Sequence, residues 1–135
     1  MVPPRISPLV FKRNFMSCLH KRVNLQNRFL LGMEFDNSGK PNRISSQSYL
    51  EPKLTAKIDN ISTNGNEVVF TTSGTARFRN SDFETVTYSV SEVKVANQDS
   101  NKGTVSFKIT DPNGTRETLE IPSCDLNFDS LKTTN

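Results

Sequence analysis

The chain has 135 residues, the size of a single domain with one hydrophobic core. Only 33% of its residues are apolar, tryptophan is absent, and Asn, Ser and Thr are abundant, as in domains rich in strands and turns. The sequence has no run of about 20 apolar residues, which excludes a transmembrane helix.

The net charge of +3 is unevenly distributed. The first 33 residues contain no acidic side chain and six basic ones: Arg5, Lys12, Arg13, Lys21, Arg22 and Arg28. From Glu34 to the end, fourteen acidic residues outnumber eleven basic ones, so we expect the rest of the chain to be electrostatically balanced. Such an asymmetry is typical of an arm that contacts an anionic surface, or of a targeting segment.

The first element in chain order is a basic N-terminal segment, residues 1–33. From Leu9 its apolar residues recur with helical spacing for about five turns. One side of the helical wheel carries Phe11, Phe15, Cys18, Leu19, Val23, Phe29 and Leu30, although Lys12, Arg22 and Gln26 also fall within this arc. We therefore expect an amphipathic helix that gives way to a strand near Asn27.

The second region, residues 34–122, has the period of two that is typical of strands. Apolar alternation predicts strands at residues 54–61, 67–72, 75–79, 83–96, 105–110 and 119–121. A change of phase near Ser91-Glu92 predicts a β-bulge. Hairpin turns are expected at Ser62–Asn66 and at Asp111–Gly114. Pro122 is expected to end the last strand, and residues 123–135 to form a frayed, polar tail.

Short loops between successive strands predict an antiparallel meander. The expected fold class is therefore mainly β, a small barrel or a highly twisted sheet with one N-terminal helix. Exposed sheet edges would allow the protein to associate with itself.

Residues with catalytic or metal-binding potential are scarce. His20 is the only histidine, and Cys18 and Cys124 are too far apart in sequence to suggest a zinc or redox motif. We expect no catalytic residue, no metal site and no cofactor. With no secretory signal evident, both cysteines are expected to be free thiols in the cytoplasm, or in an organelle if the first segment is a transit peptide.

One short segment resembles a ligand-binding family. Asn60-Ile61-Ser62-Thr63-Asn64-Gly65 resembles the Asp/Asn-x-Ser-x-x-Gly signature of PilZ domains, which bind cyclic di-GMP on a small β-barrel. The resemblance implies a dinucleotide site at Arg43, Asn60, Ser62 and Gly65. The family's Arg-x-x-x-Arg motif is incomplete, because Gln47 stands in place of its second arginine.

A second resemblance concerns metal-dependent chemistry. Asp82, Glu92 and Lys94 resemble the Asp…Glu-x-Lys pattern of restriction-endonuclease-like nucleases, in which two carboxylates hold a divalent metal. Ser81 replaces the proline that usually precedes the aspartate, and the flanking helices of that fold are not predicted here.

The sequence favours a non-catalytic β-rich binding or structural and assembly module, whose basic N-terminal segment contacts nucleic acid or another polyanion. A partner protein, a PilZ-like receptor and a metal-dependent nuclease are the alternatives. The N-terminal segment itself is open to two further interpretations, a helix packed on the β core or a cleaved transit peptide.

Overall fold

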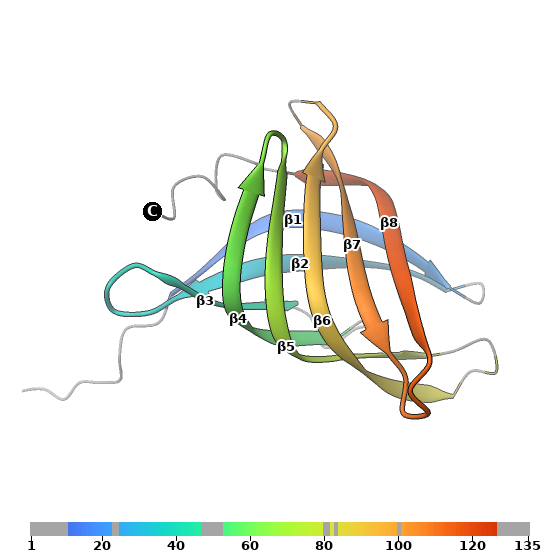
Figure 1. Ribbon diagram of the computed structural model, residues 1–135. Coiled ribbons are helices and arrows are strands. Elements are labelled where there is room, and N and C mark those ends of the chain that lie inside the picture. Colours follow the sequence, from blue (N-terminus) through green and yellow to red (C-terminus); the bar gives the residue numbers. More distant parts are fainter. Residues whose placement is uncertain are drawn as a thin grey trace, which may run out of the picture.

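The protein is a closed antiparallel β-barrel of eight strands (Figure 1). The computed structural model describes residues 11–22, 25–46, 53–79, 82, 84–99 and 101–126. The strands are β1 (Phe11–Arg22), β2 (Leu25–Phe35), β3 (Pro41–Ser46), β4 (Lys53–Asn64), β5 (Glu67–Arg79), β6 (Thr85–Asn97), β7 (Lys102–Thr110) and β8 (Arg116–Leu126). Each strand pairs with its neighbours in sequence, and β1 closes the barrel against β8. The expected meander and barrel are confirmed.

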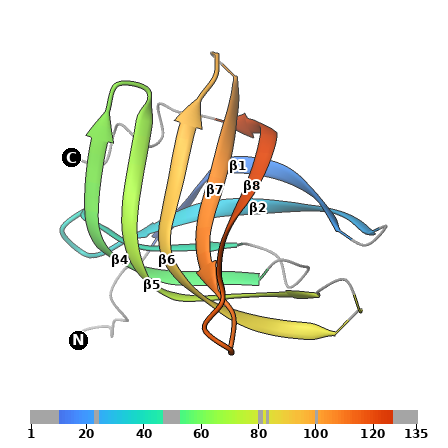
Figure 2. The same cartoon turned by 45° about the vertical axis from the view of Figure 1, so that its right-hand side comes forward.

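The strands differ in how they contribute to the barrel. β4 to β8 form a curved wall, and the β1–β2 hairpin crosses behind it (Figures 1 and 2). β3 is the shortest strand, with six residues, and pairs with β4 over three positions only. β4 therefore extends well beyond β3 toward its hairpin with β5.

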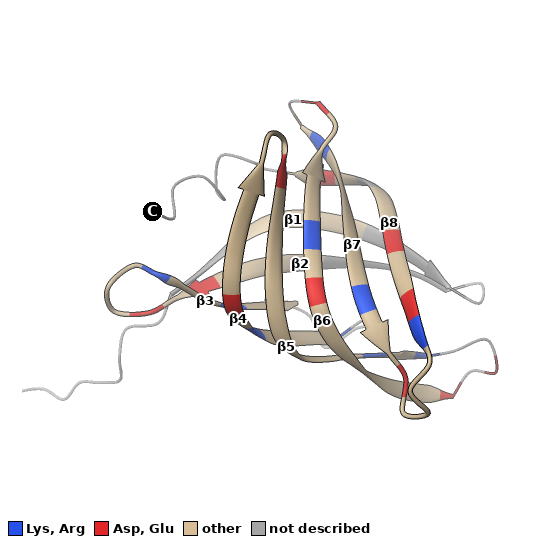
Figure 3. Cartoon of the chain, in the orientation of Figure 1, with Lys and Arg blue, Asp and Glu red and all other residues tan. Residues whose placement is uncertain are grey.

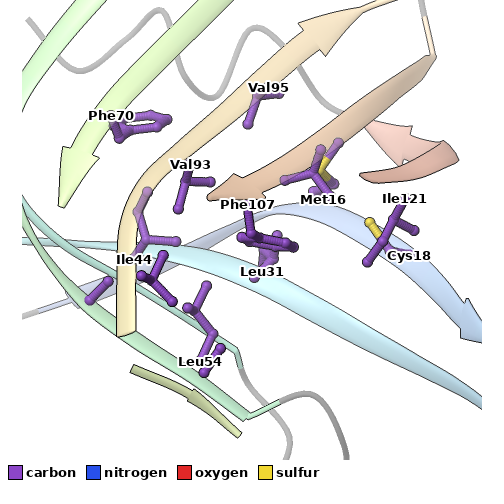
Figure 4. Close-up of a cluster of buried hydrophobic side chains, with 14 of the residues drawn as sticks. Met16, Cys18, Leu31, Ile44, Leu54, Phe70, Val93, Val95, Phe107 and Ile121 are labelled. Atoms are coloured by element: carbon purple, nitrogen blue, oxygen red, sulfur yellow. The ribbon is translucent and has the colours of Figure 1, made fainter. Parts of the chain in front are cut away.

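The interior is filled with apolar side chains that alternate with exposed polar ones along each strand. In β5, for example, Val68, Phe70, Ala76 and Phe78 are buried, and the residues between them are mostly exposed or partly exposed. Contributions come from all eight strands, including Leu31, Ile44, Leu54, Val93, Val95, Phe107 and Ile121 (Figure 4). The hydrophobic core is therefore the barrel interior, and the outer face carries the polar residues.

The expected bulge in the sixth strand is confirmed. The register between β6 and β7 shifts between Val90 and Glu92, and both Val90 and Val93 are buried. The extra residue, Ser91, restores the inward direction for the apolar residues that follow it.

The helix expected in the N-terminal segment is wrong for the residues that the structure describes, since these form β1 and β2. A β-bulge between Asn14 and Met16 buries both Phe15 and Met16, and Cys18 is buried two residues later. This uneven spacing of inward residues resembles the spacing of a helical face. The domain boundary expected after residue 33 falls within β2.

Two further expectations about strand limits are corrected. β5 is one continuous strand rather than two, with a register irregularity between Thr71 and Gly74. β8 does not end at Pro122 but continues to Leu126, so the first residues of the expected tail are part of the barrel. Pro122 lies where the register between β7 and β8 shifts, and an interrupted ladder tolerates its missing N–H. Residues 127–135 lie outside the described part of the chain.

The expectation of two free thiols is also wrong, because Cys18 and Cys124 form a disulfide. Met16 pairs with Leu126 and Ser17 with Asp125. The next step of this register places Cys18 opposite Cys124, where the disulfide forms. The two cysteines are 106 residues apart in sequence and meet only because the barrel closes. We call the contact of β1 with β8, together with this disulfide, the seam.

Two hairpin turns share one geometry. In the turn after β2, the Asp36 carboxylate accepts hydrogen bonds from the backbone N–H groups of Ser38 and Lys40. The Ser38 hydroxyl and the Lys40 N–H hold the pKa of Asp36 below its ordinary value. The Asp111 carboxylate likewise accepts from Asn113 and Thr115, which confirms the turn expected there.

Candidate anion-binding face

The outer face of β3, β4 and β5 brings four basic side chains together. Arg43 pairs directly with Lys57 across β3 and β4, and Lys53 pairs directly with Arg77 across β4 and β5. Directly opposed residues of an antiparallel pair point to the same side, with Cβ atoms about 5 Å apart. We call Arg43, Lys53, Lys57 and Arg77 the cation patch.

Two acidic residues, Glu34 and Asp59, lie beside this patch, and Asp59 accepts a hydrogen bond from the Ser73 hydroxyl, opposite Lys57 on β5. The Arg43 guanidinium lies 4.0 Å from the Glu34 carboxylate, and Glu34 also accepts a hydrogen bond from Ser45. Lys53, Lys57 and Arg77 form no ion pair with any residue that the structure describes. Like charges placed directly opposite each other in a sheet repel and destabilise it. The packing of the barrel gives no reason for this destabilising arrangement of the patch.

The remaining wall has the opposite character. Residues 41–46 and 53–79 contain five basic and two acidic residues, whereas residues 84–99 and 101–126 contain four basic and seven acidic ones. Lys102 pairs with Asp125 at 2.6 Å, and Lys108 with Glu92 at 3.6 Å. Figure 3 shows basic and acidic positions side by side on β6, β7 and β8. The positive charge of the wall is thus concentrated on β3 to β5.

A groove of about 520 Å³ lies on β6, β7 and β8, some distance across the wall from the cation patch. Its lining includes the hydroxyl groups of Ser91, Thr110 and Thr118, the basic side chains of Lys108 and Arg116 and the carboxylate of Glu117. These residues are exposed or partly exposed, so the groove belongs to the outer surface.

The six basic residues expected to bind a polyanion are only partly placed. Arg5 lies outside the described residues. Lys12, Arg13, Lys21 and Arg22 belong to β1 and Arg28 to β2, in a part of the barrel where the structure describes only the backbone of these residues. The backbone of Lys12 pairs with Glu34, which in turn pairs with Arg43. One ladder therefore connects the N-terminal segment to the cation patch.

The residues of the PilZ resemblance do not share one position on the barrel. Arg43 pairs with Lys57 and donates a hydrogen bond to the Thr55 hydroxyl at 3.2 Å. Ser62 lies five residues further along β4 than Lys57, roughly 16 Å away at the rise of a strand. Asn60 is exposed between them, and Gly65 forms the hairpin turn with a φ of 64°. The turn is thus confirmed within the expected segment, whereas Arg43 is directed toward Thr55 and Glu34.

The residues of the nuclease resemblance are also separated. Glu92 and Lys94 share the outer face of β6, whereas Asp82 precedes that strand. The seven residue steps from Thr85 to Glu92 alone span roughly 23 Å. No three His, Cys, Asp or Glu side chains within the described ranges lie close enough to hold a metal ion.

Arg77 was not singled out from the sequence, and the basic residues of the β region were expected to be balanced by acidic ones. Lys53-x-Thr55-x-Lys57 was a visible signal, since residues two apart share a face of a strand. The opposed pairs themselves depend on register between strands, which one sequence does not reveal.

The chain was compared with protein-family models, with curated proteins and with solved structures. No match was found in any of the three. No helix in the described part of the chain has the length and apolar character needed to cross a membrane.

Proposed function

We propose that this protein is a non-catalytic β-barrel binding module that holds a polyanion on the cation patch. The observation that carries the proposal is the pair of directly opposed like-charge contacts, Arg43 with Lys57 and Lys53 with Arg77. A bound anionic chain would place negative groups between these cations and convert repulsion into attraction.

The disulfide bears on the compartment in which this function takes place. Disulfides form and persist mainly in oxidising compartments. The Cys18–Cys124 bond therefore favours a protein that folds or acts outside the reducing cytoplasm. This proposal replaces the expectation of a cytoplasmic protein with two thiols.

The proposal is tested with inorganic polyphosphate over a series of salt concentrations. Changing Lys53, Lys57 and Arg77 together to Gln removes three positive charges from the patch. At about 0.7 of slope for each contact, we expect the dependence of log affinity on log salt to fall by roughly two units. The same variant should melt at an equal or slightly higher temperature, because the opposed charges no longer repel.

A matched variant carries Gln at Lys40, Lys94 and Lys102, which removes three positive charges from outside the patch. It should bind polyphosphate nearly as the unchanged protein does. A third variant, with Gln at Arg13, Lys21 and Arg28, measures how much the N-terminal segment contributes to polyphosphate binding. Equal losses in the patch variant and the matched variant, or undetectable binding at low salt, would contradict the proposal.

A further inference from the structure

A row of hydroxyl groups crosses the wall from the cation patch to the groove. Thr55 pairs with Thr75, Thr75 with Ser89, Ser89 with Thr110, and Thr110 with Arg116. All five side chains are exposed or partly exposed on the outer face. The row starts between the two opposed pairs of the cation patch and ends in the groove. We call these residues, from Thr55 to Arg116, the hydroxyl track.

Each end of the track carries positive charge. At one end, Arg43 reaches over Thr55 and donates a hydrogen bond to its hydroxyl. At the other end, Arg116 forms no ion pair with any described residue, whereas Lys108 beside it pairs with Glu92 and Glu117 also lines the groove. The bulge at Ser91 places an additional hydroxyl at this end.

The length of the track indicates an extended ligand. From β4 to β8 there are four spacings between strands, which amount to about 19 Å. A single phosphate or a mononucleotide would engage one end only. A chain of linked anionic units running across the strands would reach both ends and the hydroxyl groups between them.

We propose that the polyanion is an acidic polysaccharide lying along this track, an inference that rests on the proposed function. Single-stranded nucleic acids are usually held by aromatic side chains that stack on bases. Every aromatic side chain whose burial the structure describes is buried in the core: Phe15, Phe35, Phe70, Phe78, Tyr88 and Phe107. Rows of Thr and Ser hydroxyls between cations instead match the hydroxyl and sulfate or carboxylate groups of an acidic sugar chain. The disulfide favours the oxidising surroundings in which such polysaccharides occur.

The experiment uses the full chain with its disulfide intact and a sulfated heparin decasaccharide as the probe. Arg116→Gln should weaken binding about two- to fivefold, the effect of one exposed charge contact. Lys102→Gln, which removes a charge on the same wall away from the track, should leave the affinity unchanged. On titration with the decasaccharide, the backbone amide signals of Thr75, Ser89 and Thr110 should shift together with those of Thr55.

The outcomes separate this inference from the proposed function. If the patch variant loses binding while Arg116→Gln has no effect and shifts stop at β5, the patch holds the ligand but the track does not. If a single-stranded oligonucleotide of equal charge binds as tightly as the decasaccharide or more tightly, the ligand class is wrong. If polyphosphate binds and the decasaccharide does not, this inference fails and the proposed function stands; if none of the three probes binds, both fail.

Discussion

At the scale of single residues, the turn between β7 and β8 depends on one backbone angle. Gly114 has a φ of 90°, which other residues rarely adopt, and a Cβ built there would contact nothing. Gly114→Ala should therefore lower the free energy of unfolding by about 1 kcal/mol through backbone strain alone. Denaturant unfolding measures this change, with Asn113→Ala as the control, since only the Asn113 N–H contacts Asp111. An unchanged stability would contradict the geometry of the turn.

Gly74 is required for a different reason, which makes it a useful comparison. A Cβ at this position would collide with the Thr55 carbonyl oxygen and with the backbone of Ala56 on β4. The collision involves backbone atoms, so the two strands would have to separate. Gly74→Ala should therefore destabilise the barrel more than Gly114→Ala does, although Gly74, unlike Gly114, does not have a positive φ.

At the scale of elements, the seam is the weakest ladder of the barrel and the disulfide compensates for it. Among the described residues, β1 and β8 share two paired positions, fewer than any other neighbouring strands. A cross-link that closes a loop of about 100 residues stabilises by roughly 4–5 kcal/mol in the chain-entropy description. Replacing Cys18 and Cys124 together by Ala should remove much of this, as measured by denaturant unfolding.

The same bond has a direct chemical check. Titration of thiols in the denatured, unreduced protein should detect none, and reduction should release two. Detection of two thiols before reduction would show that the seam closes without a covalent link. In that case the double Ala variant would lose only the packing of two small side chains.

How much of each element could be predicted depends on the range of the interactions that define it. The hairpin at Asp111–Gly114 and the bulge near Ser91 follow from neighbours in sequence, and both are confirmed. β1 was misjudged because its bulge lets Phe15 and Cys18, three residues apart, both face the core, which is a spacing that a helix also satisfies. The disulfide could not be predicted, since strands at opposite ends of the chain meet only when the barrel closes.

At the scale of the whole molecule, the charge of the barrel wall follows the order of the strands in sequence. The chain after residue 33 is slightly acidic overall, but its basic residues predominate on β3 to β5 and its acidic residues on β6 to β8. Because the barrel is a meander, this difference along the chain becomes a basic side and an acidic side, and the candidate site lies on the basic side. Its chemistry was readable in Lys53 and Lys57, but its location depended on pairing across strands, which no local pattern specifies.

The arrangement of the ladders also bears on how the chain folds. Seven ladders join strands that are adjacent in sequence, and only the seam joins the two ends. Local hairpins have a small entropic cost of closure, so they are expected to form first and the seam last. The Cys18–Cys124 bond persists in the unfolded, unreduced chain, so it restricts the unfolded state and a transition state with an open seam to a similar extent. Stopped-flow measurements should therefore find that loss of Cys18 and Cys124 speeds unfolding and leaves the folding rate nearly unchanged.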